Sequence, residues 1–152
     1  MKKMGYIANG SVPAQRKFLS EHPEKHQEIF SQCPSYVYLI ATSSPPVGVD
    51  SIPLTNGRSI ATDRNLYPFK GLLAFVESVR PEETGNYDLD EDDRARIPFR
   101  GFSRFFLDQD TGGAIRGKAR ADIYFGEDEY AFFAAMNLQD SGKLYYLILK
   151  LK

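Results

Sequence analysis

The most specific structural signal in the chain is the strict alternation of side chains between residues 114 and 125. Apolar or small residues occupy every second position from Ile115 to Phe125, and charged or polar residues fill most positions between them. Successive side chains of a β-strand point to opposite faces of its sheet. The alternation therefore predicts a half-buried strand with one charged face.

Three further strand-like runs accompany this one and predict an antiparallel meander in the C-terminal half. The segments between the runs are short and rich in Asp and Gly, which is typical of turns. Turn lengths predict that Phe105 and Leu107 lie on the buried face, although a slip of one residue would reverse the faces. The middle of that face would hold small residues, namely Gly117, Ala119, Ala121 and Ala134. The four expected strands cover residues 99–107, 114–125, 129–138 and 143–151.

The N-terminal half contains helix signals and one apolar run. Ser11 suits an N-cap, and Pro23 interrupts the apolar periodicity, so we expect two short helices or one kinked helix. In residues 69–80 the apolar side chains fall on one helical face, which favours a helix. The other expected elements are a buried strand over Ser35–Ser43, a loop over residues 44–57 and a short strand over residues 58–62.

These elements predict a single α+β domain over residues 1–152, with an acidic loop at residues 82–93. N-terminal helices, one mid-chain helix and a C-terminal four-stranded antiparallel meander would form it, the meander making up most of a curved sheet. Residues 69–80 also alternate tolerably as a strand, so an all-β barrel is the alternative. The order of the elements resembles the cone-shaped α+β barrels of the ketosteroid-isomerase-like type, a likeness that does not settle function.

Composition limits the classes of protein that remain. The 152 residues include 19 Lys and Arg against 20 Asp and Glu, which argues against a protein that coats nucleic acid everywhere. The single cysteine, Cys33, excludes an internal disulfide. The chain shows no secretory signal pattern, and its apolar runs are too short to span a bilayer. We therefore expect a cytoplasmic protein with no membrane partner.

Charge is unevenly distributed along the chain despite the balanced total. Residues 82–93 contain seven acids and no Lys or Arg, whereas residues 94–120 contain seven basic residues and two acids. Basic groups interleaved with aromatic rings suit phosphates and stacked bases. The acidic run folding over the basic surface is the competing interpretation. The predicted ligand-binding residues are Arg100, Phe102, Arg104, Arg116, Lys118, Arg120 and Tyr124.

No motif in the chain indicates a particular reaction. His22 and His26 stand four residues apart, but Pro23 occupies the position where a zinc metalloprotease motif has Glu. Cys33 has no evident activating base and is expected to be inert. Asp63 and Tyr67 precede the expected helix, where capping is the simpler role and a pocket mouth is the alternative. We therefore expect no catalytic residues, no metal and no cofactor.

These observations favour a small non-enzymatic binding protein. It would engage an anionic partner, such as an acidic protein surface, a nucleotide or a nucleic acid, through its Arg-rich aromatic sheet face. A homo-oligomer is left open. The alternative function is a small-molecule-binding or catalytic pocket in a cone-shaped α+β barrel, beneath the face of small residues.

Overall fold

The structure is a computed structural model that describes residues 1–85, 87 and 95–150. By its contacts the chain divides into two compact units, Met1–Thr42 and Ser43–Lys152. This division does not test the single domain expected over residues 1–152, which stays a prediction. Most of the acidic loop expected at residues 82–93 lies outside the described residues.

The first unit consists of short helices. Ser11 caps α1, since its hydroxyl oxygen accepts a hydrogen bond from the backbone N–H of Ala14 at 3.3 Å. Pro23 begins a separate 3-10 turn, because proline supplies no N–H to continue the preceding helix. The expected pair of short helices is therefore confirmed. The elements of this unit are η1 (Lys2–Met4), α1 (Val12–Glu21), η2 (Pro23–Lys25) and α2 (His26–Phe30).

The buried strand expected over Ser35–Ser43 is wrong. Residues 35–42 have no regular secondary structure, and the side chains from Tyr36 to Ile40 are 79% to 94% exposed. Apolar character predicted burial, but a strand also needs a neighbouring strand for its backbone hydrogen bonds. This segment has no such neighbour within its own unit.

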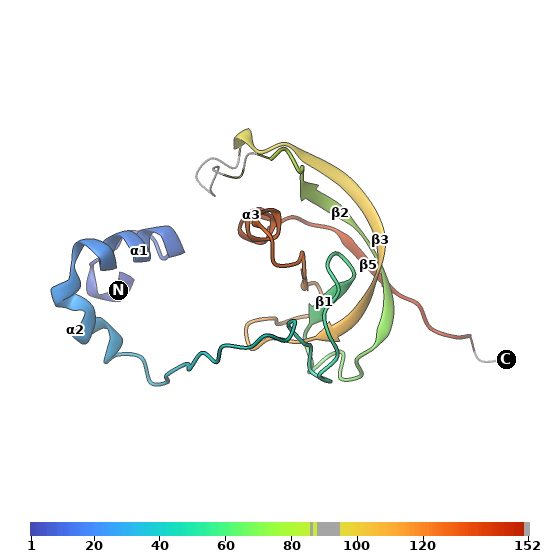
Figure 1. Cartoon of the computed structure of the whole chain (residues 1–152), viewed down its shortest axis with the longest axis horizontal. Coiled ribbons are helices and arrows are strands. Elements are labelled where there is room, and N and C mark those ends of the chain that lie inside the picture. The colour runs from blue at the N-terminus through green and yellow to red at the C-terminus, as the bar shows by residue number, and fades with distance from the viewer. Residues whose placement is uncertain (86, 88–94, 151–152) are drawn as a thin grey trace. The chain divides into compact units, whose positions relative to one another are not determined.

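The second unit is built on one open sheet, whose five strands among the described residues run in the order β4-β1-β3-β2-β5. β1 and β3 are parallel, and the other neighbouring pairs are antiparallel. Figure 1 shows the sheet as a curved layer with α3 on its concave side. The mixed α+β class is confirmed, whereas the strand arrangement differs from the meander. The elements are β1 (Ser59–Thr62), β2 (Leu72–Pro81), β3 (Phe99–Asp110), β4 (Ala121–Ile123), α3 (Glu129–Asn137) and β5 (Lys143–Tyr146).

The mid-chain helix expected over residues 69–80 is wrong, because this stretch forms β2 in the interior of the sheet. Ala74 and Val76 are buried while Leu73 is exposed, which is the two-residue period of a strand. β2 pairs with β3 on one side and with β5 on the other. These strand pairings outweigh the helical spacing of its apolar side chains. The closed barrel is also wrong, since the sheet remains open.

The run over residues 129–138 is a helix rather than a strand. The side chain of Asp128 accepts a hydrogen bond from the N–H of Ala131 at 2.7 Å and so caps α3. Alanine-rich sequence after an N-cap favours a helix. β1 also pairs directly with β3, so the consecutive hairpins of the expected meander do not form.

The alternating run over residues 114–125 forms a strand only at Ala121–Ile123. Gly117 has φ of +91°, a left-handed conformation that breaks a strand and favours glycine. The alternation that dominates the sequence therefore describes mainly a turn-rich segment.

The buried face of the sheet is also the reverse of the expected one. On β3 the Phe106 side chain is buried with Ile60, Ala74 and Val76, whereas Phe105 is 48% exposed. A second cluster joins the buried face of α3 to Ile97 and Phe125. Because the side-chain period of a strand is two, the wrong pairing partners reversed the faces.

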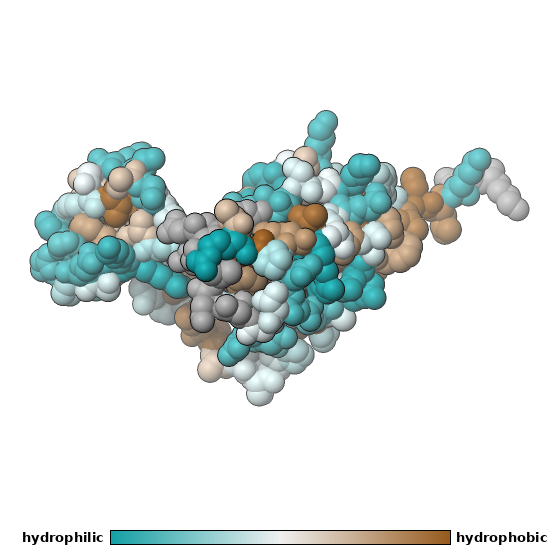
Figure 2. Space-filling view, turned by 90° about the horizontal axis from the view of Figure 1, so that it is seen from above, coloured by the Kyte–Doolittle hydropathy of each residue, from teal (hydrophilic) through white to brown (hydrophobic). Residues whose placement is uncertain are grey.

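The fourth expected strand, residues 143–151, ends early, at Tyr146. Beyond it the side chains of Ile148 and Leu149 are exposed. Figure 2 shows apolar side chains along this C-terminal stretch. Leu147 still donates its N–H to the carbonyl of Leu73 on β2.

Candidate functional site

The structure distributes the seven predicted ligand-binding residues over different elements. Arg100, Phe102 and Arg104 lie on β3, Tyr124 follows β4, and the rest lie in the segment between these strands. Phe102 packs against the buried cluster of the sheet. Several of the cations already have acidic neighbours, and ligand binding by the seven residues stays a prediction. The ion pairs are Arg100 with Glu83, Arg116 with Asp63 and Arg120 with Asp122.

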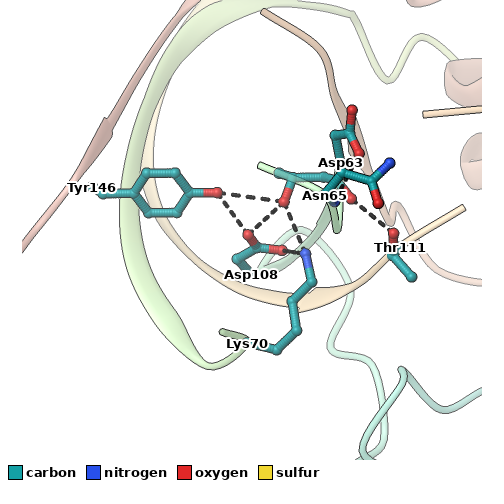
Figure 3. Close-up of polar contacts among 7 residues, drawn as sticks. Asp63, Asn65, Lys70, Asp108, Thr111 and Tyr146 are labelled. Atoms are coloured by element: carbon teal, nitrogen blue, oxygen red, sulfur yellow. Dashed lines mark hydrogen bonds and ion pairs between the residues drawn. The ribbon is translucent and has the colours of Figure 1, made fainter. Parts of the chain in front are cut away.

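A buried polar cluster instead joins side chains from β1, β3 and β5 with Lys70, which precedes β2 (Figure 3). The Asp108 carboxylate accepts three hydrogen bonds, from Lys70 Nζ at 2.9 Å and from the Thr62 and Tyr146 hydroxyls at 2.6 Å each. Lys70 Nζ also donates to the Thr62 hydroxyl oxygen at 2.9 Å. The side chains of Lys70 and Asp108 are 4% and 0% exposed, so the ion pair is shielded from water.

The environment of this cluster keeps the Tyr146 hydroxyl protonated. Burial raises the pKa of Tyr146, and the hydrogen bond to the Asp108 carboxylate raises it further. The phenol therefore acts as a fixed donor to Asp108. Its ring lies 5.0 Å from the ring of Tyr67, centroid to centroid.

Asp63 follows β1 and is held by backbone donors. Its carboxylate accepts hydrogen bonds from the N–H of Gly117 at 2.8 Å and of Asn65 at 2.9 Å, and Arg116 lies 3.5 Å away. These backbone hydrogen bonds, with Gly117 contributing most, hold the pKa of Asp63 below its ordinary value. The helix that Asp63 was expected to cap does not form, so the capping role is wrong. The carboxylate instead holds the turn at Asn65 and anchors the turn at Gly117.

Asp110 ends β3 and differs from these aspartates. Within the described part of the chain, its carboxylate has no hydrogen-bond or ion-pair partner, and the residue is half-buried. The register between β1 and β3 places Ile60 opposite Asp108 and Ala61 opposite Asp110, so Gln109 is the extra residue of a β-bulge. Bulges redirect side chains and are frequent beside active sites. Asp110 thus carries a half-buried carboxylate without a partner among the described residues.

A cavity of about 880 Å³ opens beside the buried cluster. Thr62, Tyr67, Tyr146 and Asp122 are among its lining residues, whereas Asp110 is not. The pocket-mouth alternative for Tyr67 therefore agrees with the structure. No group of three or more His, Cys, Asp or Glu side chains in the described residues is placed to hold a metal ion.

Sequence reasoning missed Lys70, Asp108 and Asp110. The segment DQDTGG was read as a turn between two strands, so its acids received no role. An available signal was the presence of two acids, Asp108 and Asp110, shortly before a pair of glycines at a strand end. Lys70 gave no signal, because only the pairing of β2 with β3 brings it to Asp108.

Comparison with known proteins supplies enzymatic relatives. The chain is 30% identical over 118 residues to the membrane-bound lytic murein transglycosylase A of Escherichia coli strain K12, covering 76% of this chain and 29% of that protein. The chain thus spans about a third of the length of the curated relatives that it matches.

Solved structures show the same fold. MltA from Neisseria gonorrhoeae has a TM-score of 0.65 at 23% identity, covering 96% of this chain and 34% of that one. A membrane-bound lytic murein transglycosylase from Agrobacterium tumefaciens has a TM-score of 0.61 at 28% identity, covering 91% and 35%. Escherichia coli MltA with bound chitohexaose has a TM-score of 0.62 at 25% identity, covering 90% and 38%.

These relatives overturn the predicted function, partners and location. They are lytic transglycosylases, so the interpretation as a non-enzymatic binder of an anionic partner is wrong. One of them holds an oligosaccharide, which contradicts a nucleic acid or an acidic protein surface as the partner. Relatives named as membrane-bound contradict the cytoplasmic expectation.

Helices long and apolar enough to cross a bilayer are absent from the described residues.

A family model described as the 3D domain matches residues 58–148. The matched segment begins directly before β1 and ends directly after β5, so it contains the whole sheet, the buried cluster and Asp110. It covers more than half of the 152 residues. The chain therefore belongs to the 3D domain family.

Proposed function

We propose that this chain carries the bond-cleaving site of a lytic transglycosylase that acts on the glycan strands of murein. Asp110 serves as its catalytic acid. The observation that carries the proposal is the half-buried carboxylate of Asp110, which has no partner among the described residues and directly follows a β-bulge within the family segment.

The neighbouring aspartates are less suited to this role. Asp108 accepts three hydrogen bonds and is sealed from solvent, so it cannot reach a substrate. Asp63 is held in its ionised form by backbone donors. Asp122 is engaged by two nitrogens of Arg120, at 2.9 Å and 3.1 Å. Among these four aspartates, Asp110 is the one that combines partial exposure with carboxylate oxygens free of partners in the described residues.

The chemistry needs one carboxyl group that changes its protonation state during turnover. Protonated Asp110 gives its proton to the glycosidic oxygen as the carbon–oxygen bond breaks, and the leaving sugar departs as an alcohol. The resulting carboxylate then takes a proton from the hydroxyl that attacks the oxocarbenium-like centre. The bond broken and the bond formed are both glycosidic, and Asp110 returns to its starting state.

The test is the Asp110→Asn variant of the full chain, incubated with purified murein. Loss of the acid is expected to lower the rate of release of soluble glycan fragments about 100-fold or more, measured by chromatography and mass spectrometry. Asp50→Asn, in an exposed loop position, is the matched control and should leave the rate unchanged. Wild-type cleavage by Asp110→Asn, or no release by the wild-type chain, would contradict the proposal.

A further inference from the structure

The wall of the cavity carries a lysine whose ammonium group has no acceptor among the described residues. This residue is Lys118, in the segment that leads from the turn at Gly117 into β4. We propose that Lys118 binds a carboxylate of the murein glycan and so makes the cavity selective for acidic over neutral oligosaccharides. The inference rests on the murein substrate of the proposed function, and it does not depend on which carboxyl group carries out the cleavage.

The charged side chains that line the cavity differ in how they are engaged. Arg120 donates two hydrogen bonds to the Asp122 carboxylate, at 2.9 Å and 3.1 Å, and a third to the carbonyl of Ala114 at 2.9 Å. The two charges of this pair therefore balance each other. Asp140 is also engaged. The side chain of Lys118, in contrast, has neither a hydrogen bond nor an ion pair in the described part of the chain.

A second lysine of the lining, Lys143, is directed elsewhere by the strand ladder. It begins β5 and lies directly opposite Glu77 of β2, and opposed residues of antiparallel strands share one face of the sheet. The next pair of the ladder, Val76 with Leu144, occupies the other face and lines the cavity. The ammonium of Lys143 therefore projects from the face that is turned away from the cavity.

The backbone that carries Lys118 is held in place by contacts on both sides. The N–H of Gly117 donates to the Asp63 carboxylate at 2.8 Å, and the carbonyl of Lys118 accepts a hydrogen bond from the Tyr67 hydroxyl at 3.2 Å. These contacts fix the point from which the lysine side chain extends. Since the backbone is ordered before a ligand arrives, less entropy is lost on binding.

Aromatic rings lie close to this cation. Tyr67, whose hydroxyl contacts Lys118, and Tyr146 both line the cavity, and their ring centroids are 5.0 Å apart. Small-molecule sites combine such apolar and aromatic surfaces with a few polar groups that fix the orientation of the ligand. A pyranose ring has an apolar C–H face and polar substituents at its edge. The tyrosine rings suit that face, and Lys118 suits a charged substituent.

Charge distinguishes murein from a neutral oligosaccharide. Murein glycan carries lactyl ethers whose carboxyl group is either free or joined to a peptide, and the peptide has carboxylates of its own. The chitohexaose held by one of the relatives has no charged group. An ammonium forms stronger, charge-assisted hydrogen bonds with carboxylates than with neutral hydroxyls or amides. Lys118 therefore favours the acidic glycan, from whichever of the two sources its carboxylate comes.

The decisive variant is Lys118→Met, which keeps an unbranched apolar side chain and removes the charge. Isothermal titration calorimetry of the full chain would give Kd for peptide-free murein glycan, peptide-bearing murein glycan and chitohexaose. We expect Kd to rise about fivefold for at least one murein glycan and to stay unchanged for chitohexaose. A rise for the peptide-free glycan alone identifies the lactyl carboxylate, and a rise for the peptide-bearing glycan alone identifies a peptide carboxylate. Added salt should reduce the difference between variant and wild type.

Two control variants test whether the effect belongs to this position. Lys150→Met removes an exposed lysine of the same unit that is not among the lining residues, and should leave every Kd unchanged. Lys118→Arg keeps the charge and should retain most of the affinity for the murein glycans.

The possible results separate this inference from the proposed function. An unchanged Kd for both murein glycans in Lys118→Met, or an equal rise for chitohexaose, would overturn the inference while the proposed function stands. The expected rise in a chain whose wild type cleaves no murein would support the inference and contradict the proposed function. A wild-type chain that binds no murein glycan would overturn both.

Discussion

None of the residues in the unit Met1–Thr42 is buried, whereas the unit Ser43–Lys152 contains two buried clusters and a buried ion pair. The helices of the first unit are held by local contacts, such as the Ser11 cap and the surface pair of Lys25 with Glu28. The sheet of the second unit is held by long-range strand pairing and packing. The same kinds of polar contact therefore act in very different surroundings.

The difference between the two units shows where a polar contact affects global stability. A surface ion pair is screened by water and contributes little, whereas removal of one partner from a buried pair leaves an uncompensated charge. We therefore expect cooperative unfolding to report on the sheet unit. Changes in the helical unit should alter only local helix content.

The largest expected effect comes from Lys70→Met. The Asp108 carboxylate would lose its buried counter-charge, so the free energy of unfolding should fall by about 3–5 kcal/mol in urea denaturation. Lys25→Met removes the cation of an exposed pair and should leave the urea midpoint unchanged. Equal shifts of the urea midpoint in Lys70→Met and Lys25→Met would contradict the distinction between the two units.

Removal of the α3 cap should have the next largest effect. Asp128→Ala leaves the N–H of Ala131 without its partner, and α3 contributes its buried face to a core cluster. The free energy of unfolding should therefore fall by about 1 kcal/mol. Asp128→Asn keeps a side-chain acceptor and should retain most of that stability.

A smaller effect should appear at low pH through Asp63. Its folded-state pKa is lowered, so its stabilising contribution is complete above the ordinary aspartate value and is lost as the pH falls below about 4. Urea midpoints measured from pH 7 to pH 3 should drop more steeply for the wild type than for Asp63→Asn. Parallel pH profiles would show that the Gly117 and Asn65 contacts do not favour the ionised form.

The smallest effect is expected for Ser11→Ala. It removes the same kind of cap as Asp128→Ala, but from a helix with no buried residue. Circular dichroism should show a small loss of helix signal with no change in the cooperative unfolding midpoint. A midpoint shift as large as that of Asp128→Ala would mean that the helical unit unfolds together with the sheet.

Local signals predicted local structure well. The Ser11 cap and the break at Pro23 appear as expected, as do the loop over residues 44–57 and the short strand at β1. Each of these features depends on backbone geometry and hydrogen bonds within a few residues. Sequence reasoning therefore reaches the right result where no distant partner is needed.

Predictions that depended on distant partners were mostly wrong. The alternation over residues 114–125 lacked the pairing that would make it one strand, and residues 69–80 became a strand because two other strands flank them. The candidate site was missed for the same reason. Lys70 and Asp108 are 38 residues apart, and their contact exists only once β2 and β3 have paired.

The sequence by itself determined the mixed α+β class, the short N-terminal helices and the presence of a long strand leading into DQDTGG. Tertiary structure alone decided the strand order, the buried face of the sheet and the separate roles of Asp108 and Asp110. The physical reason is that a carboxylate takes its role from its surroundings. Burial among three donors makes Asp108 a structural anchor, whereas Asp110, after a bulge and half-buried, has no partner among the described residues.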